Sequence, residues 1–274
     1  MPASLAGIVE AVWTLEGDVS TGSVPEPVIP DGRAEIVVHF GDRFERWDDG
    51  EPRLQPEVLV AGQLDRPLFL RATGLVAVLG VRVAPGGAPA LVGMPQAELL
   101  NLTPAASDVC RPLAAWLEHV RDVAASPAEA AGLVCDGLVR LARPESIDPR
   151  VSHAVHLASR PGADVDGLAR VAGVTRRQLQ RLFARHVGLA PRTLLRIRRL
   201  QRALALLERR ERAGSPRPGT DAALGGGYAD QAHFVRDFRA FTGGTPTAHL
   251  LSRAALTGVF VDRSTTAIAV SASV

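Results

Sequence analysis

The sequence predicts an α+β protein of two domains, with an antiparallel β sheet or barrel and a helical pair at the N-terminus and an all-α, bihelical domain at the C-terminus. In the first hundred residues, short apolar runs alternate with turn-forming residues. From about residue 96, apolar residues recur at helical spacing. In the C-terminal half, a set of landmark residues repeats after 55 positions, and such a repeat indicates two copies of one structural unit.

Four strands are expected in the N-terminal half, over residues 8–15, 34–40, 58–61 and 75–83. They are rich in Val, Ile, Leu and aromatic residues, and turn formers separate them. At Pro30-Asp31-Gly32, for example, proline presets φ and glycine accepts a positive φ. No glycine-rich phosphate loop follows these strands, so the pattern favours an antiparallel sheet or a small barrel.

Two helices are expected after the strands. The first carries an apolar stripe at i, i+3, i+4 and i+7, made by Leu113, Trp116, Leu117 and Val120. Pro127 begins the second helix, and residues 143–145 end it. We expect this pair to pack on the sheet or to form a dimer seam. The predicted domains are residues 1–105 (β-rich), 106–146 (the helical connection), 147–252 (all-helical) and 253–274 (a tail).

Charge is distributed unevenly between the two halves. Residues 1–150 hold 12 arginines against 21 acidic residues, residues 151–274 hold 19 arginines against 8, and the net charge is +2. Every basic residue is arginine, which a biased codon usage alone could explain. The segregation is more informative, because a basic half joined to an acidic one indicates a module that meets a polyanion.

Several classes of protein are disfavoured by what the sequence lacks. No apolar run approaches the roughly 18–20 residues of a membrane span, and no basic head with an apolar block marks a signal peptide. Two cysteines cannot form a disulfide scaffold or a four-cysteine zinc site. We therefore expect a soluble, cytoplasmic protein with no membrane partner, no metal and no cofactor.

The repeated landmarks are an arginine, a phenylalanine, a glycine and a proline. They occur first as Arg181, Phe183, Gly188 and Pro191, and again as Arg236, Phe238, Gly243 and Pro246. In the first copy, residues 165–172 predict a short helix that Gly173 ends. Thr175 then caps a second helix, with Gln178 at the capping-box position. Two helices joined by a tight turn containing glycine indicate a helix-turn-helix.

The outer face of that second helix suits the DNA major groove. Leu179, Leu182 and Phe183 face inward. Arg pairs with guanine O6 and N7, and Gln pairs with adenine N6 and N7. A merely solvated face normally mixes charges, whereas this helix shows no acid among its outward residues. The residues predicted to read bases here are Arg176, Arg177, Gln180 and Arg181.

The second copy has a weaker first helix, over residues 221–227, because it contains consecutive glycines. Asp230 can cap its second helix, whose apolar stripe is Phe234, Phe238 and Phe241. Ala232 and Val235 could meet thymine methyl groups. The residues predicted to read bases in this copy are Gln231, Ala232, Val235 and Arg236.

A long helix over residues 191–210 is expected between the copies. A rigid rod of this kind would fix the spacing of two reading helices, since major-groove faces recur about every 34 Å. Its arginines are either phosphate contacts or solvated charges. The phosphate contacts predicted in and around it are Thr175, Arg185, Arg192, Arg196, Arg199 and Arg202.

These motifs resemble the DNA-binding domain of the AraC/XylS transcription regulators. Residues 173–183 (GVTRRQLQRLF) with 188–191 and 199–207 resemble its first half, and residues 227–238 (GYADQAHFVRDF) with 242–246 its second. The resemblance covers about residues 150–252. It implies a seven-helix domain that reads two adjacent major-groove segments of double-stranded DNA at the eight positions given above. Gly225-Gly226 and the long Pro/Gly-rich stretch before Thr220 depart from the family pattern.

The N-terminal half resembles, less specifically, the β-rich sensor domains of such regulators, through Val12-Trp13 and residues 30–32, 80–83 and 85–87. In that family the domain binds a small effector or mediates dimerisation. The predicted function is sequence-specific transcription regulation, with activation or repression left open. The partners implied are double-stranded DNA, a small-molecule effector and a second copy of the chain as a homodimer.

Other readings compete with this one. An enzymatic or metal-binding barrel is disfavoured, because residues 1–118 hold only His39 and a metal site needs several donors. We expect His39 to pack in the structure, and Cys110 and Cys135 to be buried structural thiols rather than a redox switch. A module for RNA or an acidic protein is disfavoured because Tyr228 and the phenylalanines suit a core. An architectural DNA-binding protein remains the nearest alternative.

Overall fold

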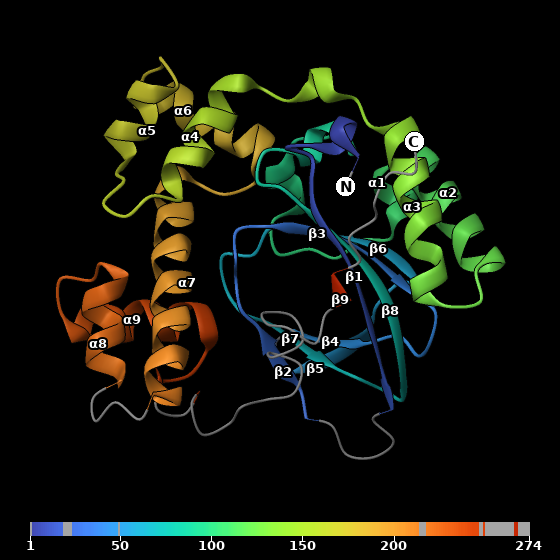
Figure 1. Ribbon diagram of the computed structural model, residues 1–274, viewed down its shortest axis with the longest axis horizontal. Coiled ribbons are helices and arrows are strands. Elements are labelled where there is room, and N and C mark those ends of the chain that lie inside the picture. The colour runs from blue at the N-terminus through green and yellow to red at the C-terminus, as the bar shows by residue number, and fades with distance from the viewer. Residues whose placement is uncertain are drawn as a thin grey trace.

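The computed structural model describes residues 2–18, 24–48, 50–213, 218–246, 249 and 266–267. Two β sheets lie between a group of helices on one side and a helical C-terminal domain on the other (Figure 1). Every strand pair in the part of the chain that the structure describes is antiparallel. The predicted α+β class, with a β-rich first domain and an all-α second one, is therefore confirmed.

The first sheet contains all four predicted strands, in the order β6-β3-β8-β1-β9. Its members are β1 (Val9–Asp18), β3 (Ala34–His39), β6 (Val58–Ala61), β8 (Leu75–Val83) and β9 (Thr266–Ala267). β9 comes from the predicted tail, and it pairs with the middle of β1 through Trp13 opposite Ala267.

The second sheet was not predicted. Its order is β2-β7-β4-β5, formed by β2 (Glu26–Val28), β7 (Leu68–Arg71), β4 (Glu45–Asp48) and β5 (Glu51–Leu54). These strands are three or four residues long, and β5 is exposed along its whole length. They lack the long apolar alternation by which half-buried strands are recognised.

The predicted helical pair packs on the first sheet. It consists of α2 (Arg111–Val123) and α3 (Pro127–Leu141), preceded by α1 (Ala106–Val109). Leu117 and Val134 share one apolar cluster with Leu79 of β8. Short 3-10 turns complete this domain at Ala3–Leu5, Ala88–Ala90, Gln96–Leu99 and Pro144–Ser146.

The C-terminal domain stands beside the sheets as a column (Figure 1). α7 (Pro191–Arg212) runs along the column, with α4 (Pro149–Ala158), α5 (Val165–Val171) and α6 (Arg176–His186) at one end and α8 (Pro218–Gly226) and α9 (Gln231–Thr242) at the other. Residues 214–217, in the Pro/Gly-rich stretch, lie outside the described residues.

His39, Cys110 and Cys135 are the side chains that we considered for a metal site or a redox switch, and all three lie in the described part of the chain. His39 is fully buried against Phe44, and burial lowers the pKa of its imidazole to about 4, so it is neutral at pH 7. Cys135 is buried as predicted, whereas Cys110 is only half-buried. Among the described residues, we find no cluster of metal-ligating side chains and no helix suited to crossing a membrane.

Candidate nucleic-acid interface

The first helix-turn-helix is α5 and α6. Gly173 lies between them with φ +64°, a left-handed conformation that favours glycine. Thr175 and Gln178 form the predicted capping box: the backbone N–H of Gln178 donates to Thr175 Oγ1 over 3.3 Å, and the backbone N–H of Thr175 donates to Gln178 Oε1 over 2.9 Å. This cap fixes where α6 begins.

Burial then orients α6. Leu179 and Phe183 are fully buried, so the opposite face of the helix must point outward. Arg177, Gln180 and Arg181 are exposed there, and Arg185 is exposed near the helix end. The arrangement leaves these guanidinium and amide groups available to a ligand.

Arg176 is held differently. Its guanidinium donates two hydrogen bonds to the two carboxylate oxygens of Asp166, which lies on α5. This carboxylate stands beside α6 although α6 itself carries no acid on its outer face. The pair is exposed, and water screens surface ion pairs so that they contribute little to stability. A phosphate or a base edge can therefore compete with Asp166 for Arg176.

The second unit is α8 and α9. The backbone N–H of His233 donates to the carboxylate of Asp230 over 2.7 Å, so Asp230 caps α9 as predicted. Phe234, Phe238 and Phe241 are buried. The outward face is smaller and less polar than that of α6: Gln231, Ala232 and Arg236 are exposed, and Val235 is half-exposed.

A buried carboxylate on α9 is the residue that sequence reasoning missed. Asp237 is 4% exposed and accepts hydrogen bonds from Arg196 Nε and Nη2 of α7, over 3.1 and 2.7 Å. The signal was present in the sequence, since Asp237 follows Phe234 by three positions and so lies on the apolar stripe. A carboxylate at such a position requires a partner.

Among the described residues, some arginines of α7 pair with or lie over other side chains of the domain, and others do not. Arg196 holds Asp237 and also lies over the ring of Phe241, with 4.8 Å from its Cζ to the ring centroid. Arg199 lies over Tyr228 at 5.4 Å. Arg192 is exposed, and desolvation lowers the pKa of the half-buried Arg202. Arg196, predicted as a phosphate contact, thus has a structural partner of its own.

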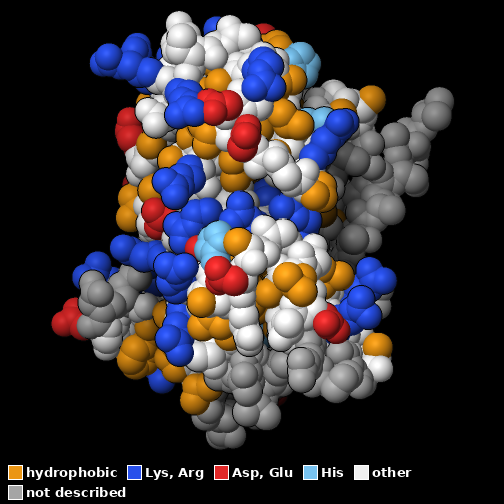
Figure 2. Space-filling view, turned by 90° about the vertical axis from the view of Figure 1, so that its left-hand side faces the viewer, with side chains coloured by type: hydrophobic (Ala, Val, Ile, Leu, Met, Phe, Trp, Pro, Cys, Tyr) orange, Lys and Arg blue, Asp and Glu red, His pale blue; other side chains and the backbone are white. Residues whose placement is uncertain are grey.

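A cleft of about 780 Å³ separates the two units. Its walls come from α5, α6, α7 and α9, so α6 and α9 border the same groove. Figure 2 shows arginine side chains gathered across the middle of this side of the molecule. The arginines that line the cleft are Arg176, Arg192, Arg196, Arg199 and Arg236.

Two helix-turn-helix units on one rod, with guanidinium groups along a shared groove, define a DNA-binding protein of the transcription-regulator class. The comparisons agree. Residues 168–251 match a family described as a helix-turn-helix domain, and residues 2–104 match a family described as a domain of unknown function (DUF6597). The C-terminal domain is of the AraC/XylS type, and the chain is an AraC-type DNA-binding transcription regulator.

Solved structures also match, among them two that differ in how much of this chain they cover. ToxT from Vibrio cholerae is 10% identical, with a TM-score of 0.49; the match covers 88% of this chain and 98% of ToxT. A probable AraC family transcriptional regulator from Rhodopseudomonas palustris is 28% identical, with a TM-score of 0.33; that match covers 38% of this chain and 96% of the other. No curated protein matches the chain.

Proposed function

We propose that this regulator recognises a specific DNA sequence by placing α6 and α9 in two adjacent major-groove segments of one duplex. The observation that carries the proposal is the groove shared by the two helices on α7. α7 has 22 residues, and at 1.5 Å per residue it is about 33 Å long. Major-groove faces recur about every 34 Å along one side of B-DNA, and α7 holds α6 and α9 beside the same groove, so we propose that the two helices enter consecutive faces.

The roles of the side chains follow from their exposure. The side chains on the outward faces of α6 and α9 contact the base edges. Arg176 contacts a base edge as well, although it is paired with Asp166 in the free protein. Arg185, Arg192, Arg199 and Arg202 contact phosphates, with Thr175 contributing besides its role as a cap. The base-reading residues are Arg176, Arg177, Gln180, Arg181, Gln231, Ala232, Val235 and Arg236.

The rest of the chain modulates this binding. We propose residues 147–252 as the DNA-binding domain, and residues 1–105 with the helical connection 106–146 as a domain that senses a small molecule or joins two copies of the chain. Regulation of transcription by this route requires no catalytic step, and the protein would act in the cytoplasm, where its DNA lies.

Arg181→Ala tests the base-reading role. We expect it to weaken binding to the preferred site by about 1–3 kcal/mol and to relax the preference at one base pair, because a bidentate contact to a base edge is lost. Arg192→Ala should instead weaken all sequences evenly and lower the slope of log K against log salt by about 1. Binding-site selection and salt titrations measure both effects.

Arg160→Ala serves as the control, since Arg160 is exposed and lies outside the helices that line the groove. Its affinity and selectivity should equal those of the unchanged protein. Equal behaviour of the Arg181 and Arg192 variants would contradict the assignment of roles. A preference for no sequence at all would favour an architectural DNA-binding protein instead.

A further inference from the structure

Asp166 and Arg176 bring opposite charges together inside the groove between the two helix-turn-helix units. Arg176 is the first residue of α6, and Asp166 lies on α5. Both residues line the groove, and 67% of the Arg176 side chain and 49% of the Asp166 side chain are exposed. Residues near the N-terminus of the second helix are the ones that meet base edges in helix-turn-helix proteins. The ion pair therefore lies where we propose that α6 meets the DNA.

The ion pair occupies only one edge of the guanidinium. Arg176 Nε donates to Asp166 Oδ1, and Arg176 Nη2 donates to Asp166 Oδ2. A guanidinium carries five N–H groups, so two N–H groups on Nη1 and one on Nη2 remain. These groups make no other hydrogen bond within the part of the chain that the structure describes. One N–H of Nη1 and the free N–H of Nη2 are parallel, and they form a two-pronged donor at the end of the side chain.

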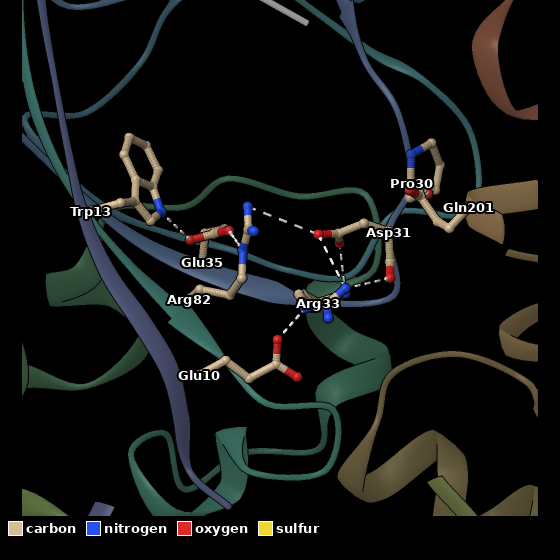
Figure 3. Close-up of polar contacts among 8 residues, drawn as sticks. All are labelled: Glu10, Trp13, Pro30, Asp31, Arg33, Glu35, Arg82 and Gln201. Carbon is tan, nitrogen blue, oxygen red and sulfur yellow. Dashed lines mark hydrogen bonds and ion pairs between the residues drawn. The ribbon is translucent and has the colours of Figure 1, made fainter. Parts of the chain in front are cut away.

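Arg82 of the N-terminal domain shows a more enclosed arrangement (Figure 3). Its Nε donates to Glu35 Oε1 over 2.7 Å, and its Nη2 lies 4.0 Å from Asp31 Oδ2. Carboxylates of two residues thus surround Arg82, and 26% of its side chain is exposed. Arg176, by contrast, is hydrogen-bonded to one carboxylate and lines an open groove. Its free donors are therefore accessible to a ligand in the groove.

Guanine is the base whose major-groove edge matches these free donors. It presents two acceptors side by side, O6 and N7. Adenine presents an amino group beside its N7, cytosine presents an amino group, and thymine presents one acceptor beside a methyl group. Among the four bases, guanine alone accepts from two parallel N–H groups. A guanine can therefore bind the end of Arg176 without displacing Asp166.

A phosphate is a poorer partner for the paired Arg176. Phosphates attract net positive charge, and the Asp166 carboxylate offsets the charge of the guanidinium. Hydrogen bonding from Arg176 lowers the pKa of Asp166, so this carboxyl is ionised at neutral pH. It also repels a phosphate directly. A phosphate must therefore displace Asp166 to contact Arg176 fully, whereas a guanine leaves the ion pair intact.

The ion pair also orients the guanidinium before DNA binds. A flexible side chain loses conformational entropy when a ligand immobilises it. Two parallel hydrogen bonds to one carboxylate fix the plane of a guanidinium, so part of this loss has already occurred in the free protein. Asp166 thus favours a contact that depends on direction over a contact that depends on charge alone.

We propose that Asp166 is a specificity-determining residue, which holds Arg176 so that it reads one guanine in the major groove rather than a phosphate. The inference rests on the proposed function, because it assigns one base pair within the segment that α6 would read. Asp166 acts through Arg176 and is a positioning residue. Its removal should therefore change selectivity and nonspecific affinity in opposite directions.

Asp166→Asn tests this, because it removes the charge and keeps the size of the side chain. We expect the preference for guanine at one base pair to fall by at least about 5-fold. Binding to duplexes of unrelated sequence should become tighter by about 3-fold at low salt, and the slope of log K against log salt should steepen by about 1, because Arg176 becomes free to contact a phosphate. Binding-site selection and salt titrations with the full chain measure these effects.

Three further variants separate this role from a general effect of charge. Glu118→Gln also removes a carboxylate, from an exposed position on α2, and should alter neither base preference nor salt slope. Arg176→Lys keeps the charge but lacks the two-pronged donor, so it should lose the guanine preference with an unchanged slope. In the background of Arg176→Ala, adding Asp166→Asn should not change the base preference again.

Two results would overturn the inference. One is an undiminished guanine preference in Asp166→Asn, and the other is an equal gain of nonspecific affinity in Asp166→Asn and Glu118→Gln. Because exposed ion pairs contribute little to stability, loss of the pair should leave the fold intact. If the unchanged protein selected no DNA sequence at all, the proposed function itself would be refuted.

Discussion

Arg196→Ala is expected to lower the free energy of unfolding by about 3 kcal/mol and to abolish specific binding at the DNA segment that we propose α9 reads. The variant leaves the carboxylate of Asp237 buried without the guanidinium that accounts for both of its short contacts. An uncompensated buried charge of this kind costs about 3–5 kcal/mol. Chemical denaturation and binding to DNA carrying one or both segments measure the two effects.

Substitution of the other partner, Asp237, should lower the free energy of unfolding less. In Asp237→Asn the side chain of Arg196, which is 38% exposed, returns toward water, so we expect a loss of about 1 kcal/mol. Arg196→Met combined with Asp237→Leu removes both charges and should recover most of the stability. If the Arg196 variant were as stable as the unchanged protein, the ion pair would not be what holds α9 against α7.

Gly188→Ala is expected to destabilise the protein by about 3 kcal/mol and to loosen the first helix-turn-helix from the N-terminal domain. Gly188 follows α6 with φ +88°, which costs an alanine about 1–2 kcal/mol. The added Cβ would also lie 2.8 Å from the carbonyl oxygen of Gln96. A backbone atom cannot move aside as a flexible side chain would, so the contact between the domains must open.

Gly173→Ala is the matched control for that change. Gly173 has φ +64° in the turn of the same unit, and a Cβ there meets no atom within 4 Å among the described residues. Gly173→Ala should lose only the free energy of placing an alanine in the left-handed conformation, about 1–2 kcal/mol. Thermal unfolding gives the stabilities, and limited proteolysis between the domains reports their separation. Equal losses in the two variants would mean that the contact at Gln96 contributes nothing.

The strands of the first sheet were predictable because each has its own pattern of apolar residues. Residues 58–61 and 75–83 form strands with the predicted boundaries. The second sheet depends on pairing instead. In β4, Glu45 faces Arg71 of β7 across the sheet and accepts a hydrogen bond from Arg71 Nε over 2.8 Å. A strand of four residues with charged side chains is stable only beside such a partner, and the partner is distant in sequence.

The same distinction applies to the two helix-turn-helix units and the groove between them. The cap at Thr175 and the burial of Phe183 are predicted by residues within one or two helical turns, and both are confirmed. Asp166 beside Arg176 and Asp237 beside Arg196 are separated by 10 and 41 positions. The spacing of residues within one helix does not predict these ion pairs, because the partners lie on different helices and meet only when the helices pack together.

The sequence by itself determined the two domains, their helices and the outward arginines and glutamines, since capping and amphipathic spacing act over a few neighbouring residues. Only the tertiary structure showed which of the arginines that line the groove form an ion pair with a buried carboxylate, as Arg196 does with Asp237. It alone placed Gln201 against Pro30, 171 positions away in the chain. The physical reason is that a contact between domains depends on how whole surfaces fit together, and that fit is a property of the packed cores rather than of any local segment.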